Sequence, residues 1–65
     1  MTIGSIVEHW AYGRGVILAI EKADPIGFVQ VHWNEPVEWE DDGVDVVDHV
    51  YWTDADEVIM ISEAK

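Results

Sequence analysis

The sequence predicts an all-β fold, a small closed or half-closed barrel of five strands in which residues 1–65 form one domain. Five short runs are rich in β-branched and aromatic residues, which favour strands. Turn-forming residues separate these runs, and no segment has the spacing of an amphipathic helix. A chain of 65 residues is too short for a two-sheet sandwich, so closing one sheet on itself is the simplest way to bury its apolar face.

The first two strands are expected at residues 5–10 (SIVEHW) and 15–21 (GVILAIE). The connection between them contains Gly13 and Gly15. Glycine adopts positive φ without steric cost, so both residues are expected to let the chain reverse.

The same connection carries aromatic and basic side chains. We expect Trp10 or Tyr12 to cover one end of the barrel. Arg14 is one of only three basic residues in the chain, and we expect it to reach a carboxylate from the tip of the turn.

The third strand is expected at residues 28–33 (FVQVHW), after a loop that contains Pro25 and Gly27. Apolar and polar residues alternate in this run, which is typical of a strand with one buried face. We therefore predict that Trp33 is a core residue.

The last two strands are expected at residues 44–52 (VDVVDHVYW) and 57–62 (EVIMIS). Between them, residues 54–57 are expected to form a single 3₁₀ or helical turn, with the Asp54 carboxylate as its cap. We predict that Trp52, at the end of the fourth run, is buried like Trp33.

The order of these motifs resembles that of SH3-like barrels, including Tudor-like modules, and is most similar to the small SH3-like proteins of tailed bacteriophages, especially marine ones. The likeness covers nearly the whole chain, through GSIVEHWAYGRGVILAIE, FVQVHW and YWTDADEVIMIS. The resemblance implies the fold and a phage setting, in the virion or the host cytoplasm. Its positions in this chain are Gly4, Val7, Gly13, Gly15, Val16, Val31, Trp33, Trp52, Glu57, Val58 and Ile61.

One segment departs from the SH3-like pattern. Residues 35–48, between the third and fourth runs, are longer and more acidic than the pattern needs, so we expect an acidic loop or hairpin there. Residues 35–57 hold ten of the fourteen carboxylates and no lysine or arginine.

The net charge of −11 limits the partners that the protein is expected to bind. Direct binding to nucleic acid or to an anionic membrane depends on Lys and Arg, so we expect neither. A partner with a basic or partly apolar patch is favoured instead. With no long apolar run, the chain is expected to be soluble, and to be monomeric unless a lattice holds it.

The sequence shows no enzyme, metal or cofactor motif. The three histidines, His9, His32 and His49, stand in three different runs without the short spacing of a zinc site. There is no cysteine, and GRG lacks the residues of a phosphate-binding loop. We therefore expect no catalysis and no bound cofactor.

A non-enzymatic protein-interaction module is the function that the sequence favours. Its expected contact surface is the acidic segment with Trp39 at its centre, and Trp10, Tyr12 and Arg14 are a second candidate surface. Aromatic residues surrounded by a polar rim are typical of binding surfaces. The main set is Glu38, Trp39, Glu40, Asp41, Asp42 and Asp45.

Three roles are compatible with such a module. The first is capsid decoration, as an accessory protein of a phage virion. The second is inhibition of a host nucleic-acid-binding protein by carboxylates that imitate DNA phosphates. The third is a Tudor-like aromatic cage for a cationic group, although a chain of this size also needs its aromatic rings for the core.

Overall fold

The computed structural model describes residues 2–64 as one antiparallel sheet with the strand order β4-β3-β2-β1-β5. All five predicted strands and the predicted 3₁₀ turn are confirmed, although Asp54 makes no side-chain cap hydrogen bond. The elements are β1 (Ile6–His9), β2 (Gly13–Glu21), β3 (Phe28–Asp41), β4 (Val44–Asp54), η1 (Ala55–Glu57) and β5 (Val58–Ser62).

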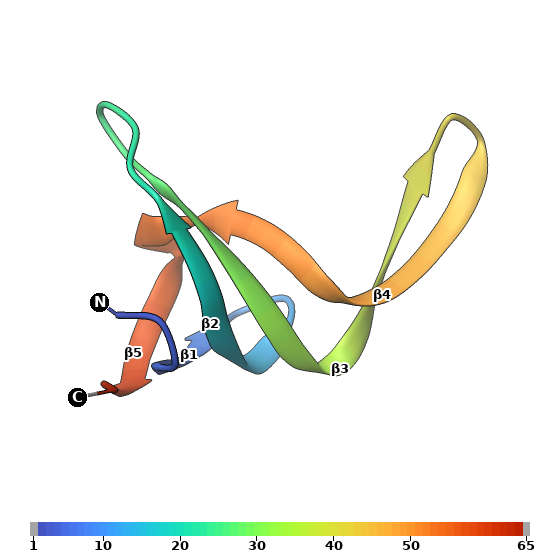
Figure 1. Cartoon of the computed structure of the whole chain (residues 1–65). Coiled ribbons are helices and arrows are strands. Elements are labelled where there is room, and N and C mark those ends of the chain that lie inside the picture. Colours follow the sequence, from blue (N-terminus) through green and yellow to red (C-terminus); the bar gives the residue numbers. More distant parts are fainter. Residues whose placement is uncertain (1, 65) are drawn as a thin grey trace.

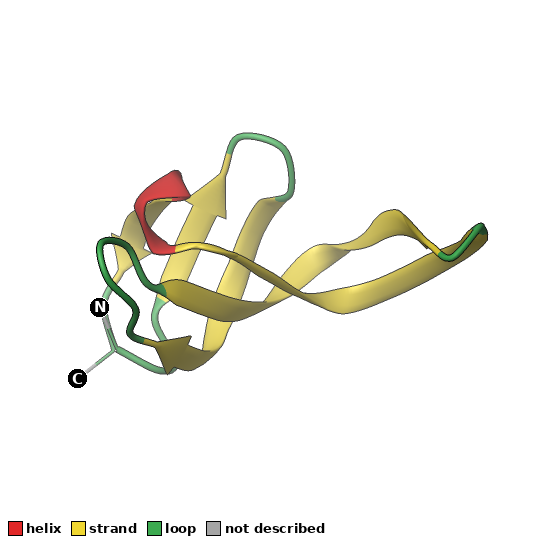
Figure 2. Cartoon of the chain, turned by 90° about the horizontal axis from the view of Figure 1, so that it is seen from above, coloured by secondary structure: helices red, strands yellow, loops and turns green. Residues whose placement is uncertain are grey.

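The sheet is strongly curved but is not closed (Figures 1 and 2). Strands β4 and β5 stand at its two ends, and no hydrogen-bonded ladder joins them. The all-β class is therefore confirmed. Of the predicted closed or half-closed barrel, the closed form is wrong because β4 and β5 are not paired, and the SH3-like identity remains a prediction.

One face of the sheet forms the core. Alternating residues of β3 point into it, and the indole of Trp33 is fully buried, as predicted. The buried apolar side chains are Val7, Ile17, Val29, Val31, Trp33, Val37 and Val58.

The prediction that Trp52 is buried is wrong. Trp52 is 42% exposed because it lies opposite Gln30, while its neighbour Tyr51 lies opposite the buried Val31. Successive side chains of a strand point to opposite faces, so this register places Trp52 on the outer face of the sheet. The run VDVVDHVYW contains no clean alternation that identifies its buried face.

The two glycines between the first strands have different roles. Gly13 has a φ of 78°, which suits the reversal of the chain. Gly15 lies within β2, opposite Val7 and Trp33, where an added Cβ would stand 2.5 Å from Val31 Cγ1 and 2.7 Å from the His32 carbonyl oxygen. Gly15 is therefore required by the close approach of β2 and β3, and the prediction that it serves the turn is wrong.

The acidic segment is a β-hairpin, because β3 continues to Asp41 and β4 begins at Val44. Its turn is Asp42–Gly43, and both residues have positive φ, 51° and 76°. Positive φ at both central residues is the requirement of a type I′ turn, the turn that best matches the twist of a two-residue hairpin. The hairpin extends away from the rest of the sheet (Figure 1).

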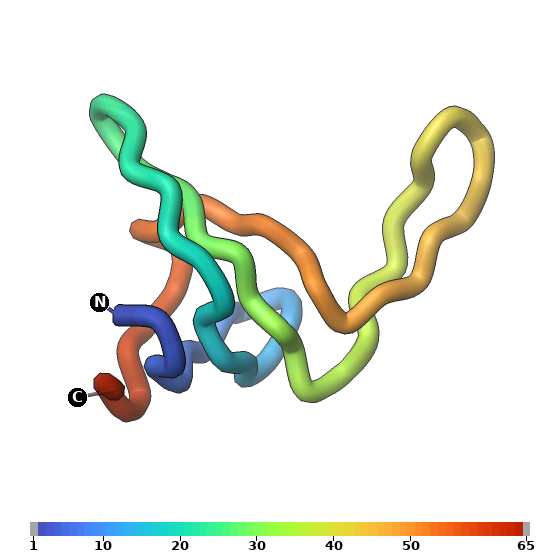
Figure 3. The backbone as a smooth tube through the Cα atoms, viewed as in Figure 1, coloured from blue at the N-terminus to red at the C-terminus, as the bar shows by residue number. Residues whose placement is uncertain are grey.

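The hairpin leaves the sheet where the β3–β4 ladder is interrupted, between His32 and Val37 (Figure 3). Two side chains bond to the backbone at this point. His49 Nδ1 donates to the Trp33 carbonyl at 2.9 Å, and the Val50 amide donates to Asp48 Oδ1 at 3.1 Å. The rings of His32 and His49 also stack, with centroids 5.2 Å apart.

Candidate functional site

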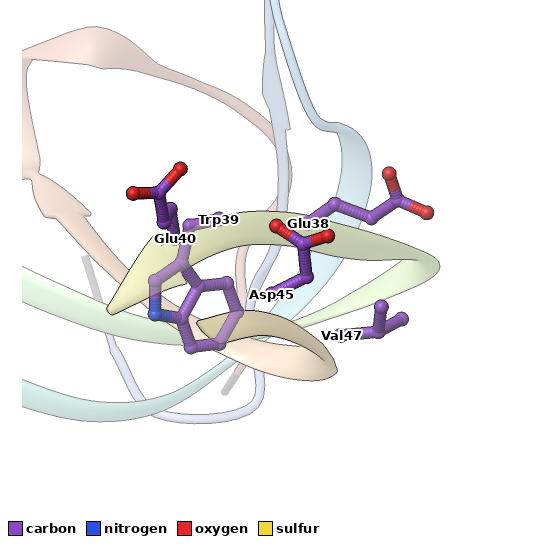
Figure 4. A pocket seen from close by; sticks show the side chains of 5 residues that line it. All are labelled: Glu38, Trp39, Glu40, Asp45 and Val47. Carbon is purple, nitrogen blue, oxygen red and sulfur yellow. The ribbon is translucent and has the colours of Figure 1, made fainter. Parts of the chain in front are cut away.

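Three carboxylates share one face of the hairpin. Glu38 and Glu40 are two positions apart on β3, and Asp45 on β4 lies directly opposite Glu40. Figure 4 shows the three carboxylates on the same side of the ribbon. A shallow depression of about 380 Å³ lies among them, lined by Glu38, Trp39, Glu40, Asp45 and Val47.

The pair formed by Glu40 and Asp45 brings like charges together. In a type I′ hairpin the residues that flank the turn, here Asp41 and Val44, are joined by hydrogen bonds. The alternation of antiparallel pairs makes Glu40 and Asp45 the next, non-hydrogen-bonded pair, whose side chains are closer together. Like charges in such positions destabilise a hairpin. No lysine or arginine among residues 2–64 forms an ion pair with either carboxylate.

The remaining predicted site residues of the hairpin do not join this acidic face. Trp39 and Asp41 lie on the opposite face of β3, and Asp42 stands in the turn. The indole of Trp39 packs against Tyr51, with ring centroids 4.7 Å apart. Trp39 therefore borders the depression but does not stand among the carboxylates. The prediction that it is the centre of the acidic surface is wrong, because the alternation of the strand turns its ring to the other face (Figure 4).

The second predicted surface is divided as well. Trp10 is 86% exposed on the β1–β2 turn, whereas Tyr12 is half-buried against the core. Arg14 lies in β2 opposite Glu8, and its Nε is 3.6 Å from Glu8 Oε1. The expectation that Arg14 reaches a carboxylate is confirmed, but Arg14 is in a strand and not at the tip of the turn.

His9 organises the connection between β1 and β2. The Ala11 amide donates to His9 Nδ1 at 2.9 Å, so the ring proton belongs on Nε2, which donates to Glu57 Oε2 at 3.0 Å. The imidazole also stacks on Tyr12, with centroids 4.4 Å apart. This buried histidine thus ties the turn to the 3₁₀ helix η1 and has a structural role.

Four of the aromatic rings, Tyr12, Trp33, Trp39 and Tyr51, pack against one another in a continuous cluster. Tyr12 packs against Trp33 at 5.3 Å and against Tyr51 at 5.5 Å, measured between ring centroids. Trp39 continues this cluster through Tyr51. The arrangement favours packing as the use of these rings.

Burial raises the pKa of Tyr12 above its ordinary value of 10.0, and the neighbouring Tyr51 and the Glu57 carboxylate raise it further. Because the pKa of Tyr12 is higher in the folded than in the unfolded state, the protonated phenol stabilises the folded state. This stabilisation is fully present below pH 10.0 and is lost as the pH rises through the folded-state pKa. We expect the stability of the protein to fall above that pH, and to fall less steeply in Tyr12→Phe. Urea unfolding of both proteins between about pH 8 and pH 11 measures this, and parallel losses would contradict the assignment.

Residues 2–64 contain no cluster of three or more side chains suited to hold a metal ion. In the same part of the chain, no helix has the length and apolar character needed to span a bilayer.

Two exposed apolar side chains of the hairpin were missed by the sequence analysis. Val44 is 63% exposed and Val47 is 58% exposed. The alternation of valine and aspartate in VDVVD could have indicated their exposure, but that run was expected to belong to the body of the sheet.

Comparison with protein families, curated proteins and solved structures finds no match for the chain.

Proposed function

We propose that the chain is a non-enzymatic protein-interaction module and that the acidic face of the β3–β4 hairpin binds a basic patch on its partner. The observation that carries this proposal is the pair of Glu40 and Asp45, directly opposite each other and unpaired with any described lysine or arginine. A cationic partner group placed between them converts a local repulsion into an attraction.

The hairpin is suited to this role by its shape. It protrudes from the sheet, so a partner can approach its acidic face and its turn (Figure 1). A lysine or arginine side chain of the partner fits the depression of about 380 Å³, where Glu38, Glu40 and Asp45 surround its charge. The net charge of −11 also steers a basic partner toward the protein and speeds association.

The setting of this interaction is part of the proposal. An SH3-like barrel of the phage type implies either capsid decoration or a host target whose nucleic-acid site the carboxylates occupy. Mass spectrometry of purified particles separates the two settings, because a decoration protein is present in many copies per particle. The aromatic-cage role is less favoured, because Tyr12, Trp33, Trp39 and Tyr51 pack against one another.

The test is a triple variant, Glu38→Gln, Glu40→Gln and Asp45→Asn, which changes the net charge from −11 to −8. Its matched control makes the same change of charge away from the hairpin, with Glu21→Gln, Asp24→Asn and Asp56→Asn, three exposed positions. Wild type and both variants are immobilised and used to capture proteins from the same lysate.

We expect the control to retain the same basic proteins as the wild type, and the hairpin variant to lose them. Its stability should be unchanged or slightly higher, because the repulsion between Glu40 and Asp45 is gone. Equal capture by all three proteins would show that the hairpin is not the binding element.

A further inference from the structure

The outer edge of β4 within the hairpin is available for pairing with another strand. β4 stands at the end of the sheet order, so residues 44–48 have β3 on one side and no described strand on the other. We propose that this edge receives an extended segment of the partner as an added strand, and that the segment alternates basic and apolar residues. This inference rests on the proposed function and specifies the partner that the acidic face binds.

The register identifies the backbone groups that receive the strand. Glu40 with Asp45 and Glu38 with Val47 are the non-hydrogen-bonded pairs of the hairpin. The amide and carbonyl groups of Asp45 and Val47 therefore point away from β3, toward the open edge. Such unpaired groups are the template on which strand addition occurs.

The other side of the hairpin is less suited to a strand. Pro36 of β3 has no amide hydrogen, and proline is one of the residues that block pairing at an edge. On β4 itself, the Val50 amide is already bonded to the Asp48 carboxylate, which limits the open edge to the hairpin.

A second copy of the chain is disfavoured as the occupant by charge. Pairing two hairpins through β4 would bring together the acidic hairpins of two chains, each with a net charge of −11. A basic strand has the complementary charge.

The two faces of the hairpin define the alternation of the occupant. On β4, one face carries Asp45 and Val47, opposite Glu40 and Glu38 of β3, and the other face carries Val44, Val46 and Asp48. Alternate residues of an added strand lie about 6.6–6.8 Å apart on the same face. Basic residues at alternate positions lie on the face that carries Glu38, Glu40 and Asp45, and the apolar residues between them lie on the face that carries Val44 and Val46.

The experiment uses the full chain and the peptide acetyl-KVKVKVKV-amide, with acetyl-KKVVKKVV-amide as a control of the same composition without alternation. NMR titration gives the affinity of each peptide, and amide hydrogen exchange reports on Asp45 and Val47. Val47→Pro removes the edge amide, while Val47→Thr keeps it and is the matched control. The NMR amide spectra of both variants are first compared with that of the wild type, to establish that each variant is folded.

We expect the alternating peptide to bind at least about tenfold more tightly than its control, and to slow exchange at Asp45 and Val47 by about tenfold or more. Val47→Pro should weaken this binding by about tenfold, the effect of roughly one hydrogen bond, and Val47→Thr should not. If Val47→Pro is unfolded, the exchange measurement on the wild type decides alone.

Two other results have distinct meanings. In the first, both peptides bind the wild type equally, neither binds the hairpin triple variant, and amide exchange at Asp45 and Val47 is not slowed. This result overturns strand addition and leaves the proposed function standing. Failure of both peptides to bind the wild type at low salt overturns the proposed function together with this inference.

Discussion

Trp33→Ala is expected to leave the protein largely unfolded. The indole is 0% exposed and touches the rings of His9 and Tyr12 within the core. Truncating a buried tryptophan costs about 3–5 kcal/mol. A domain of this length has a total stability of only about 3–10 kcal/mol. Circular dichroism and thermal melting of the variant measure this loss directly.

Trp52→Ala is the matched control for Trp33→Ala, because it removes the same side chain from the outer face of the sheet. Its loss should be clearly smaller, about 1 kcal/mol, since the indole is 42% exposed. Equal destabilisation by the two substitutions would contradict the register that places Trp52 outside.

His9→Ala is expected to have the second-largest effect, a loss of about 2–4 kcal/mol. The substitution removes the acceptor of the Ala11 amide, the donor to Glu57 and the ring that stacks on Tyr12. For a domain of this size such a loss lowers the melting temperature by about 10–25 °C. Differential scanning calorimetry of the purified variant is the measurement.

Glu57→Gln removes the negative charge of the Glu57 side chain but keeps an oxygen that can accept a hydrogen bond from His9. The amide oxygen still accepts from His9 Nε2, so the loss should stay below about 1 kcal/mol. A melting temperature for His9→Ala close to that of the wild type would show that the imidazole does not hold the turn to η1.

The sequence analysis identified the five strands because their cues are local. Runs such as FVQVHW alternate with the period of a strand, and the glycines and aspartates between the runs mark turns. The sequence Asp42–Gly43 is itself one of the strongest hairpin signals, and it indicates where β3 and β4 meet.

Features that depend on long-range contacts were not predictable. The polar stretch NEPVEWED was expected to form a loop or part of a hairpin, and its pattern did not decide between them. It extends β3 because Val37 is buried and Trp39 packs on Tyr51. The same packing turns Trp39 away from the acidic face. Closure of the sheet depends on contacts between its two end strands, about which the local pattern carries no information.

The central claim is that the carboxylates of the hairpin, and not the net charge alone, recognise the partner. The measurement that tests it most directly is the rate of association with a captured partner, for the wild type, the hairpin triple variant and its charge-matched control, at about 50 mM and about 300 mM salt. We predict that the hairpin variant associates about tenfold more slowly at low salt and shows a weaker salt dependence, while the control follows the wild type. Equal association rates for the two variants at both salt concentrations would contradict the claim.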